Sequence, residues 1–174
     1  AENLYNKVHV NHNLYVDSQK NIAINKSKLG FFKVGEQQLI KLIDDYSNSD
    51  NLLVALADLY RLEKKYDEAT TYYSKIINLQ DSSFSELWRL LYLRGICFER
   101  LSKWNLAEKD FLHSLKIKPN SPQVLNYLAY GWLERDQNLD QAIQMLHKAY
   151  EANPQSYYIL DSLARGYYKI NELQ

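Results

Sequence analysis

The sequence contains very few of the residues that build tight turns and covalent cross-links. Its 174 residues include one cysteine, three prolines and five glycines. A single cysteine, Cys97, excludes an internal disulfide, and its apolar helical surroundings predict a buried side chain. An all-β chain needs many tight turns, which so few prolines and glycines do not supply. The composition therefore favours helices.

The charge and the hydropathy of the chain exclude further classes of protein. Lysine plus arginine and aspartate plus glutamate number 21 each, so no net charge attracts the chain to nucleic acid or to an anionic membrane. No run approaches the roughly 18 consecutive apolar residues that indicate a membrane span. We therefore expect no nucleic-acid partner and no insertion into a membrane.

Small residues recur along the chain at a nearly constant interval. The alanine or glycine that would open the second helix of successive helix pairs lies at Ala1, Gly35, Ala69, Ala107 and Ala142, at intervals of 34, 34, 38 and 35 residues. Other residues recur in phase with the last three of these, namely Leu53, Leu56, Ala57, Tyr60 and Tyr73, then Leu91, Gly95, Phe98, Phe111 and Pro119, then Ala129, Leu133, Leu146 and Pro154. The period predicts a repeated helix–turn–helix unit.

This order of large, small, aromatic, alanine and proline residues resembles the tetratricopeptide repeat (TPR) family, whose unit has 34 residues. The resemblance is strong from Leu52 to Tyr168 and weaker before it. Arg94 and Asn126 depart from it, because they occupy positions where the family prefers an apolar residue, and Tyr130 occupies a position that is usually small. The resemblance implies an all-α fold, a right-handed superhelical α-solenoid of TPR helix–turn–helix repeats.

We expect one TPR array over residues 1–174. Its units would be residues 1–15 (the end of a preceding unit), 16–49 (a degenerate repeat), 50–83, 84–122, 123–156 and 157–174 (an incomplete repeat). The long interval before Ala107 predicts that the first helix of 84–122 is about one turn longer, with Ser82 or Ser83 as its cap.

The recurring small residues have a physical explanation. Two helices that pack at roughly 8–10 Å need small side chains where they cross, and a stacked repeat needs one such point per helix. The predicted crossing points are Ala57, Ala69, Gly95, Ala107, Ala129 and Ala142.

No group of residues has the pattern of a catalytic or metal centre. His9 and His12 lack a third ligand at a suitable spacing. Asp44 and Asp45 are adjacent, so their carboxylates point to different sides of a helix and form a poor acid–base pair. The stretch 28–38 contains two glycines but lacks the Lys-Ser/Thr ending of a phosphate-binding loop. We therefore predict that the chain is not an enzyme and binds no metal or cofactor.

The remaining candidate site is a surface. In TPR arrays the first helices of successive units line a concave groove that holds an extended peptide or a helix. Tyrosine and arginine are enriched where proteins bind proteins, and arginine binds carboxylates bidentately. Helical spacing places the candidate partner-binding residues on this concave face: Asp58, Arg61, Arg89, Tyr92, Glu99, Tyr127, Glu134, Arg135, Tyr158, Asp161 and Arg165.

We predict a protein–protein interaction scaffold that binds a peptide or protein segment in this groove. The clamp with which some TPR proteins hold a terminal carboxylate is not expected, because Lys20 and Arg89 match its pattern while Ile24, Ala55 and Leu93 do not. Three alternatives stay open. In the first, the tyrosines and charged residues simply solvate the face and bind no partner. In the second, the chain is a spacer that self-associates through open repeat ends such as the incomplete C-terminal repeat. In the third, it is the non-catalytic arm of a larger enzyme.

Residues 81–168 also look like bacterial TPR arrays that are made with secretory signals. The chain begins at Ala1 rather than methionine, which is compatible with the removal of such a signal. On this resemblance we expect a location in the bacterial periplasm or envelope, with the cytoplasm as the alternative.

Overall fold

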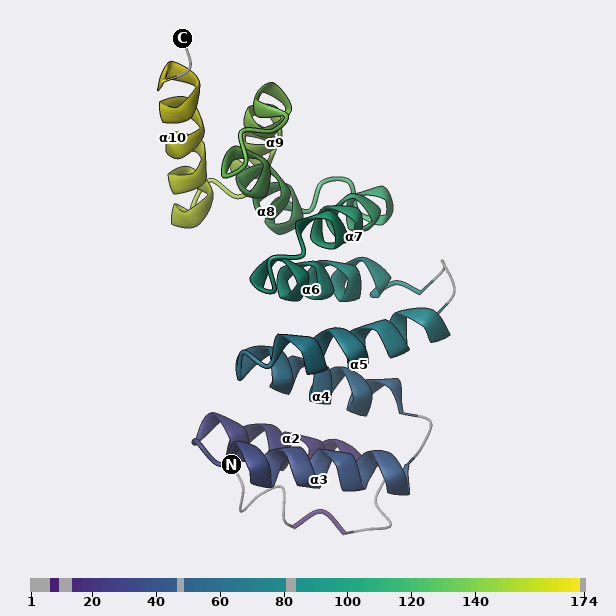
Figure 1. The fold of residues 1–174 in the computed structure, drawn as a ribbon. Helices are drawn as coiled ribbons and strands as arrows, with labels where there is room; N and C mark the ends of the chain where they lie inside the picture. Colours follow the sequence, from purple (N-terminus) through teal and green to yellow (C-terminus); the bar gives the residue numbers. More distant parts are fainter. Residues whose placement is uncertain (1–6, 10–13, 47–48, 81–83, 173–174) are drawn as a thin grey trace. The chain divides into compact units, whose positions relative to one another are not determined.

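The structure of the chain is a computed structural model that describes residues 7–9, 14–46, 49–80 and 84–172. Within these ranges it contains nine α-helices and no β-strand (Figure 1). The predicted all-α fold is confirmed. No helix in the described ranges combines the length and the apolar character needed to cross a membrane.

The chain forms two compact units, residues 1–81 with 100–102 and residues 82–99 with 103–174. In the first unit α2 (Tyr15–Lys28) packs against α3 (Phe32–Asp45), and α4 (Asp50–Leu62) packs against α5 (Tyr66–Leu79). Both α2 and α3 also contact α4, so the two helix pairs stack on each other. The largest fully buried side chains of this unit are Ile22, Leu39, Leu52, Leu56, Tyr73 and Ile76.

The second unit contains α6 (Leu87–Arg100) except for its last residue, together with α7 (Trp104–Ile117), α8 (Pro122–Leu133), α9 (Leu139–Ala152) and α10 (Tyr157–Glu172). Helix α7 packs on α8, α8 packs on α9, and α10 contacts both α8 and α9. Its hydrophobic core includes Trp104, Phe111, Leu128, Trp132 and Leu146.

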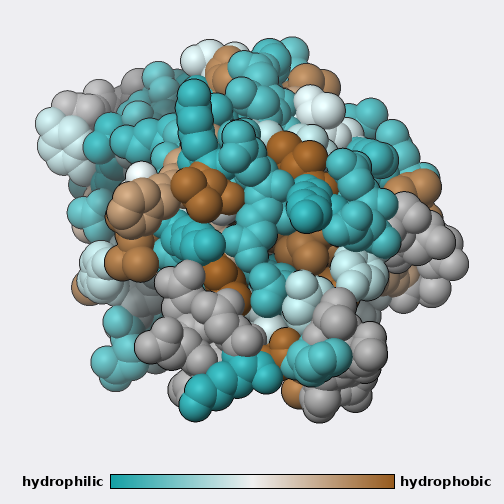
Figure 2. Space-filling model, turned by 90° about the horizontal axis from the view of Figure 1, so that it is seen from below, coloured by the Kyte–Doolittle hydropathy of each residue, from teal (hydrophilic) through white to brown (hydrophobic). Residues whose placement is uncertain are grey.

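On the face shown in Figure 2, hydrophobic side chains occur as small patches separated by hydrophilic ones. Scattered patches of this kind are ordinary on a protein surface, so the visible part of this face gives no specific indication of a binding site.

The small residues that the sequence predicts at helix crossings are buried in the structure. The five predicted alanines are fully buried, at 0% exposure: Ala57, Ala69, Ala107, Ala129 and Ala142. At the sixth position, a Cβ atom added to Gly95 would lie 2.7 Å from the Cε1 atom of Phe111. A larger residue at Gly95 would therefore push α6 away from α7.

Ala107→Leu is expected to lower the free energy of unfolding by about 1–3 kcal/mol, because three additional carbon atoms do not fit a packed helix crossing. Chemical denaturation followed by circular dichroism measures the loss. The matched control is Ala152→Leu, at an exposed alanine of α9, which should change stability by no more than about 0.5 kcal/mol. Equal losses in the two variants would contradict the assignment of Ala107 as a crossing point.

Two residues that depart from the family pattern at apolar positions leave the helices intact. The Arg94 guanidinium donates two hydrogen bonds of 2.7 Å, from Nε and Nη2, to the Asp110 carboxylate on α7. Asn126 is buried near the start of α8. Helices α6 and α8 run without interruption through both residues. At Arg94 an ion pair between the helices therefore replaces the usual apolar contact.

The extra turn predicted for the first helix of unit 84–122, which is α6, is not found in the described residues. Helix α6 has 14 residues, against 13 in α4 and 12 in α8, a difference smaller than one turn. Additional residues of the long interval lie between α5 and α6, and the predicted caps Ser82 and Ser83 fall outside the described residues. Most of the expected preceding unit, 1–15, also falls outside them, and residues 7–9 are not helical.

The turns inside the helix pairs share one backbone feature. Each contains a residue with positive φ: Gly30 at 91°, Lys64 at 60°, Ser102 at 58°, and Asp136 and Asn138 at 52° and 46°. The left-handed region reverses the chain at the end of the first helix, and glycine enters it without steric cost. Only the first of these turns uses glycine.

Candidate functional site

A cavity of about 530 Å³ lies between the first helices α2 and α4 of the first unit. Its apolar lining is Ile24, Val54, Ala55, Leu59 and Leu62, and its polar lining is Lys20, Ser27, Lys28, Asn51, Asp58, Arg61 and Glu63. We call this cavity and its lining the α2–α4 groove.

Helical periodicity explains why these residues line one groove. Side chains three or four positions apart share one face of a helix, as Lys20, Ile24 and Lys28 do on α2 and as Val54, Asp58 and Arg61 do on α4. The opposite face of each helix is buried against the rest of the unit. The groove is therefore formed by facing sides of two adjacent first helices.

The charged residues Asp58 and Arg61 are held by a side chain of the second helix. Tyr73 of α5 is fully buried, and its hydroxyl donates a hydrogen bond to the Asp58 carboxylate. The Arg61 Nε atom donates to the Tyr73 hydroxyl at 3.3 Å, and Nη2 lies 3.6 Å from Asp58 Oδ1. Burial, and next the negative charge of Asp58, raise the pKa of Tyr73 well above its usual range. The phenol therefore stays protonated and fixes both charges in the groove wall.

The lysines of the groove are in different situations. Lys20 Nζ lies 2.6 Å from the exposed carboxylate of Asp17 on the same helix. Lys28, in the last turn of α2, is exposed and forms no ion pair with any described residue. An exposed ion pair within one helix contributes little free energy, so Lys20 would lose little by leaving Asp17 for a ligand. Lys28 would lose no ion pair with any described residue.

In the second unit the predicted tyrosines contribute to the core as well as to the surface. The rings of Tyr92 and Tyr127 meet edge to face, with centroids 5.5 Å apart. Both are half-buried and lie against Phe111, at centroid distances of 6.2 and 6.0 Å. Their replacement would therefore disturb packing, which makes them unsuitable for a simple test of binding.

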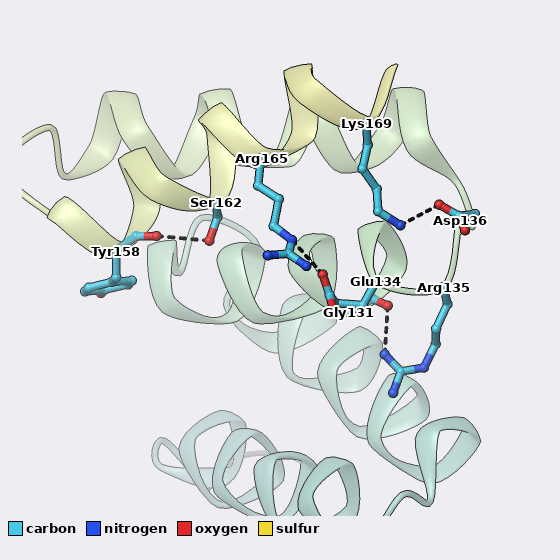
Figure 3. Close-up of polar contacts among 8 residues, drawn as sticks. All are labelled: Gly131, Glu134, Arg135, Asp136, Tyr158, Ser162, Arg165 and Lys169. Atoms are coloured by element: carbon cyan, nitrogen blue, oxygen red, sulfur yellow. Dashed lines mark hydrogen bonds and ion pairs between the residues drawn. The ribbon is translucent and has the colours of Figure 1, made fainter. Parts of the chain in front are cut away.

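The structure brings several of the predicted charged residues together at the end of α8 (Figure 3). Arg165 of α10 places Nε 2.7 Å from Glu134 Oε1, and Lys169 places Nζ 2.6 Å from Asp136 Oδ1. Arg135 donates a hydrogen bond of 2.9 Å to the carbonyl of Gly131. The two ion pairs join α10 to the residues that follow α8, so the charges here already have intramolecular partners.

The Arg135 guanidinium also lies 4.1 Å from the ring centroid of Trp104, so its position is set by a cation–π contact. Arg165 lies in the same way 5.6 Å from Tyr130, the large residue at a usually small position.

The remaining predicted residues lie on first helices without an evident common site. Arg89 and Glu99 are half-buried on α6, and Asp161 is exposed on α10. Tyr158 is exposed and contacts the ring of Tyr157 at 6.0 Å. Their role in binding stays a prediction.

Sequence reasoning missed part of the α2–α4 groove, namely Lys28, Ser27, Val54, Leu62 and the buried Tyr73 behind it. Stepping three and four residues from Asp58 would have found Val54 and Leu62. Nothing in the spacing distinguishes Tyr73 from an ordinary core aromatic residue.

The described part of the chain contains no group of three histidine, cysteine, aspartate or glutamate side chains that could hold a metal ion. Cys97 is fully buried, as predicted.

Comparisons with known proteins agree with this architecture. Residues 51–82 match the family model described as tetratricopeptide repeat. A TPR repeat-containing protein of Methanocaldococcus jannaschii is 31% identical over 122 residues, which are 69% of this chain and 20% of that protein. The chain thus spans about a fifth of the length of this curated relative.

Solved structures share the fold at low sequence identity. The crystal structure of a MamA protein has a TM-score of 0.75 at 14% identity, over 92% of this chain and 85% of that chain. A tetratricopeptide repeat protein from Parabacteroides merdae also has a TM-score of 0.75, at 18% identity, over 90% of this chain and 60% of that one. These likenesses concern the fold alone. Together with the helices described above, they confirm the predicted solenoid of helix–turn–helix repeats.

Proposed function

Because the chain is a tetratricopeptide repeat protein, and TPR arrays are in general protein–protein interaction scaffolds, we propose that its first-helix faces bind a peptide or a protein segment. The observation that carries this proposal is the α2–α4 groove. Its volume of about 530 Å³ lies within the range of ligand pockets, and its lining combines an apolar centre with a few polar groups.

We propose that the chain acts by binding and not by catalysis. TPR proteins are typically non-catalytic scaffolds. The alternative is the binding arm of a larger enzyme, since the matched stretch makes up only 20% of the curated relative.

Selection from a random peptide library, followed by NMR titration of the isotope-labelled chain with a selected peptide, tests the proposal. The expected shifts are those of the amides of Lys20, Ile24, Val54 and Asp58. Shifts confined to the outer faces of α3 and α5, or no selected peptide at all, would contradict the groove as the binding site.

Two valine variants supply the matched control. Val54→Asp places a charge in the apolar centre of the groove and should weaken peptide binding at least tenfold. Val34→Asp makes the same change at an exposed valine of α3, outside the groove, and should leave binding unchanged.

A specific observation favours self-association as a second function. Helix α10 exposes a stripe of apolar side chains, with Tyr157 at 84% and Leu160 at 52% exposure, continued by Ala164, Tyr167 and Tyr168. A second copy of the chain that packs on this stripe would bury it.

The variant Tyr157→Ser with Leu160→Ser is expected to weaken self-association roughly a hundredfold, since each side chain contributes about 1.5 kcal/mol or more when buried. Sedimentation over a concentration series measures this change. Leu106→Ser, at an exposed leucine of α7, is the control and should associate like the unmodified chain. A single monomeric species of the unmodified chain at every concentration would remove this second function.

A further inference from the structure

We propose that the α2–α4 groove selects peptides in which an apolar side chain stands close to a carboxylate. The apolar side chain enters among Ile24, Val54 and Leu62, and the carboxylate binds Lys28. This inference rests on the proposed function, because it specifies which peptides the groove prefers.

The apolar preference follows from the exposed side chains of the groove. Leu62, in the lining of the α2–α4 groove, is 59% exposed, and Ile24 and Val54 are half-buried in the same lining. The buried Ala55 and Leu59 complete the apolar lining. A leucine-sized side chain placed there would remove apolar surface of both molecules from water, which corresponds to roughly a tenfold to hundredfold gain in affinity.

The preference for an acidic neighbour follows from the charges of the lining. The groove is lined by three cations and two carboxylates, namely Lys20, Lys28, Arg61, Asp58 and Glu63, whereas the whole chain has no net charge. Asp17, which pairs with Lys20 from outside the lining, offsets the excess of one positive charge, so the acidic preference rests on the charge of Lys28, which no described carboxylate pairs.

The identity of the binding cation follows from the contacts inside the groove. The Arg61 guanidinium contacts both Tyr73 and Asp58, and Lys20 contacts Asp17. Lys28 is the lining cation that is exposed and forms no ion pair with any described residue. Arg61 therefore acts as a part of the wall, and Lys28 takes the carboxylate of the partner. One exposed ion pair changes affinity only a few-fold, so the apolar contact dominates.

Peptides from a random ten-residue library, displayed on phage and selected on the whole chain, test this preference. The enriched peptides should carry a large apolar residue with aspartate or glutamate within three positions. One enriched sequence, synthesised with blocked ends and a fluorescent label, then gives affinities by fluorescence polarisation. The same peptide with lysine in place of its acidic residue should bind a few-fold more weakly.

Four variants assign the two contacts. Leu62→Ser should weaken binding at least tenfold, while Leu79→Ser, at a leucine of α5 with 64% exposure outside the groove, should not change it. Lys28→Glu should weaken binding of the acidic peptide and improve binding of its lysine counterpart. Lys75→Glu, at an exposed lysine of α5, should do neither. All four positions are exposed, and circular dichroism melts confirm that each variant folds.

The outcomes separate this inference from the proposed function. If peptides bind and respond to Val54→Asp but show no acidic preference, or ignore Leu62→Ser or Lys28→Glu, the inference is overturned while the groove remains a binding site. If no peptide is enriched, or if binding ignores Val54→Asp as well, both the inference and the groove function are overturned.

Discussion

Asp110→Ala is expected to lower the free energy of unfolding of the second unit by about 3–5 kcal/mol. The Asp110 side chain is 6% exposed and that of Arg94 is 16% exposed, with two hydrogen bonds of 2.7 Å between them. Removal of the carboxylate leaves a guanidinium in a poorly hydrated site without this counter-charge. Urea denaturation followed by circular dichroism measures the loss.

The double variant Asp110→Ala with Arg94→Leu is the informative control. Leucine restores the apolar residue that the family prefers at this position, and a buried ion pair replaced by apolar groups is often close to neutral. The double variant should therefore recover most of the stability that the single variant loses. If both variants lose the same amount, the loss comes from the cavity at Asp110 and not from the unmatched charge.

Tyr73→Ala is expected to destabilise the first unit by about 3–5 kcal/mol, because Tyr73 is fully buried and its ring leaves a cavity in the core. Tyr73→Phe keeps the ring and removes only the hydroxyl group that binds Asp58 and Arg61. It should cost about 1.5–3 kcal/mol, the contribution of a hydrogen bond to a charged group. Thermal or chemical unfolding of the two variants separates packing from hydrogen bonding, and equal losses would contradict the separation.

The same phenol predicts a loss of stability in alkali. Burial, followed by the charge of Asp58, raises the pKa of Tyr73 above its ordinary value of 10.0, so the folded chain keeps a proton that the unfolded chain releases. The contribution of this group is fully present below pH 10 and falls above it, by up to about 1.4 kcal/mol per pH unit. Denaturation curves of the unmodified chain and of Tyr73→Phe between pH 8 and pH 11 test this. Parallel declines would show that Tyr73 does not cause the loss.

The helices and their contact points could be predicted because the sequence states both. Only a small side chain fits where two helices cross at a short distance, so the alanines that recur at the repeat interval, such as Ala69 and Ala107, predict where the helices cross. The length of α6 could not be predicted, because the repeat period counts residues and does not say whether the extra ones are helical. Arg94 was visible as a departure, but its partner Asp110 follows from the packing of α6 on α7.

The candidate site was predictable only in outline. Helical spacing places Asp58 and Arg61 on the face of α4 that lines the groove, but their contact with Tyr73 depends on how far a side chain of α5 reaches between the helices. Tyr92 and Tyr127 have a similar ambiguity, since a tyrosine on the same helical position can lie on the surface or contribute its ring to the core. The structure shows them half-buried.

Two of the turns that join the helices of each pair lower the stability of the chain, because a residue other than glycine adopts the left-handed conformation there. Lys64 and Ser102 adopt the left-handed conformation with φ of 60° and 58°, which costs a residue with a side chain roughly 1–2 kcal/mol. Glycine at these two positions would relieve the strain and lose part of the gain to greater freedom of the unfolded chain. Natural sequences need only remain above the stability that function requires. A variant with glycine at these two turns should therefore be more stable than the present sequence. It is a suitable starting point for substitutions in the groove that cost stability.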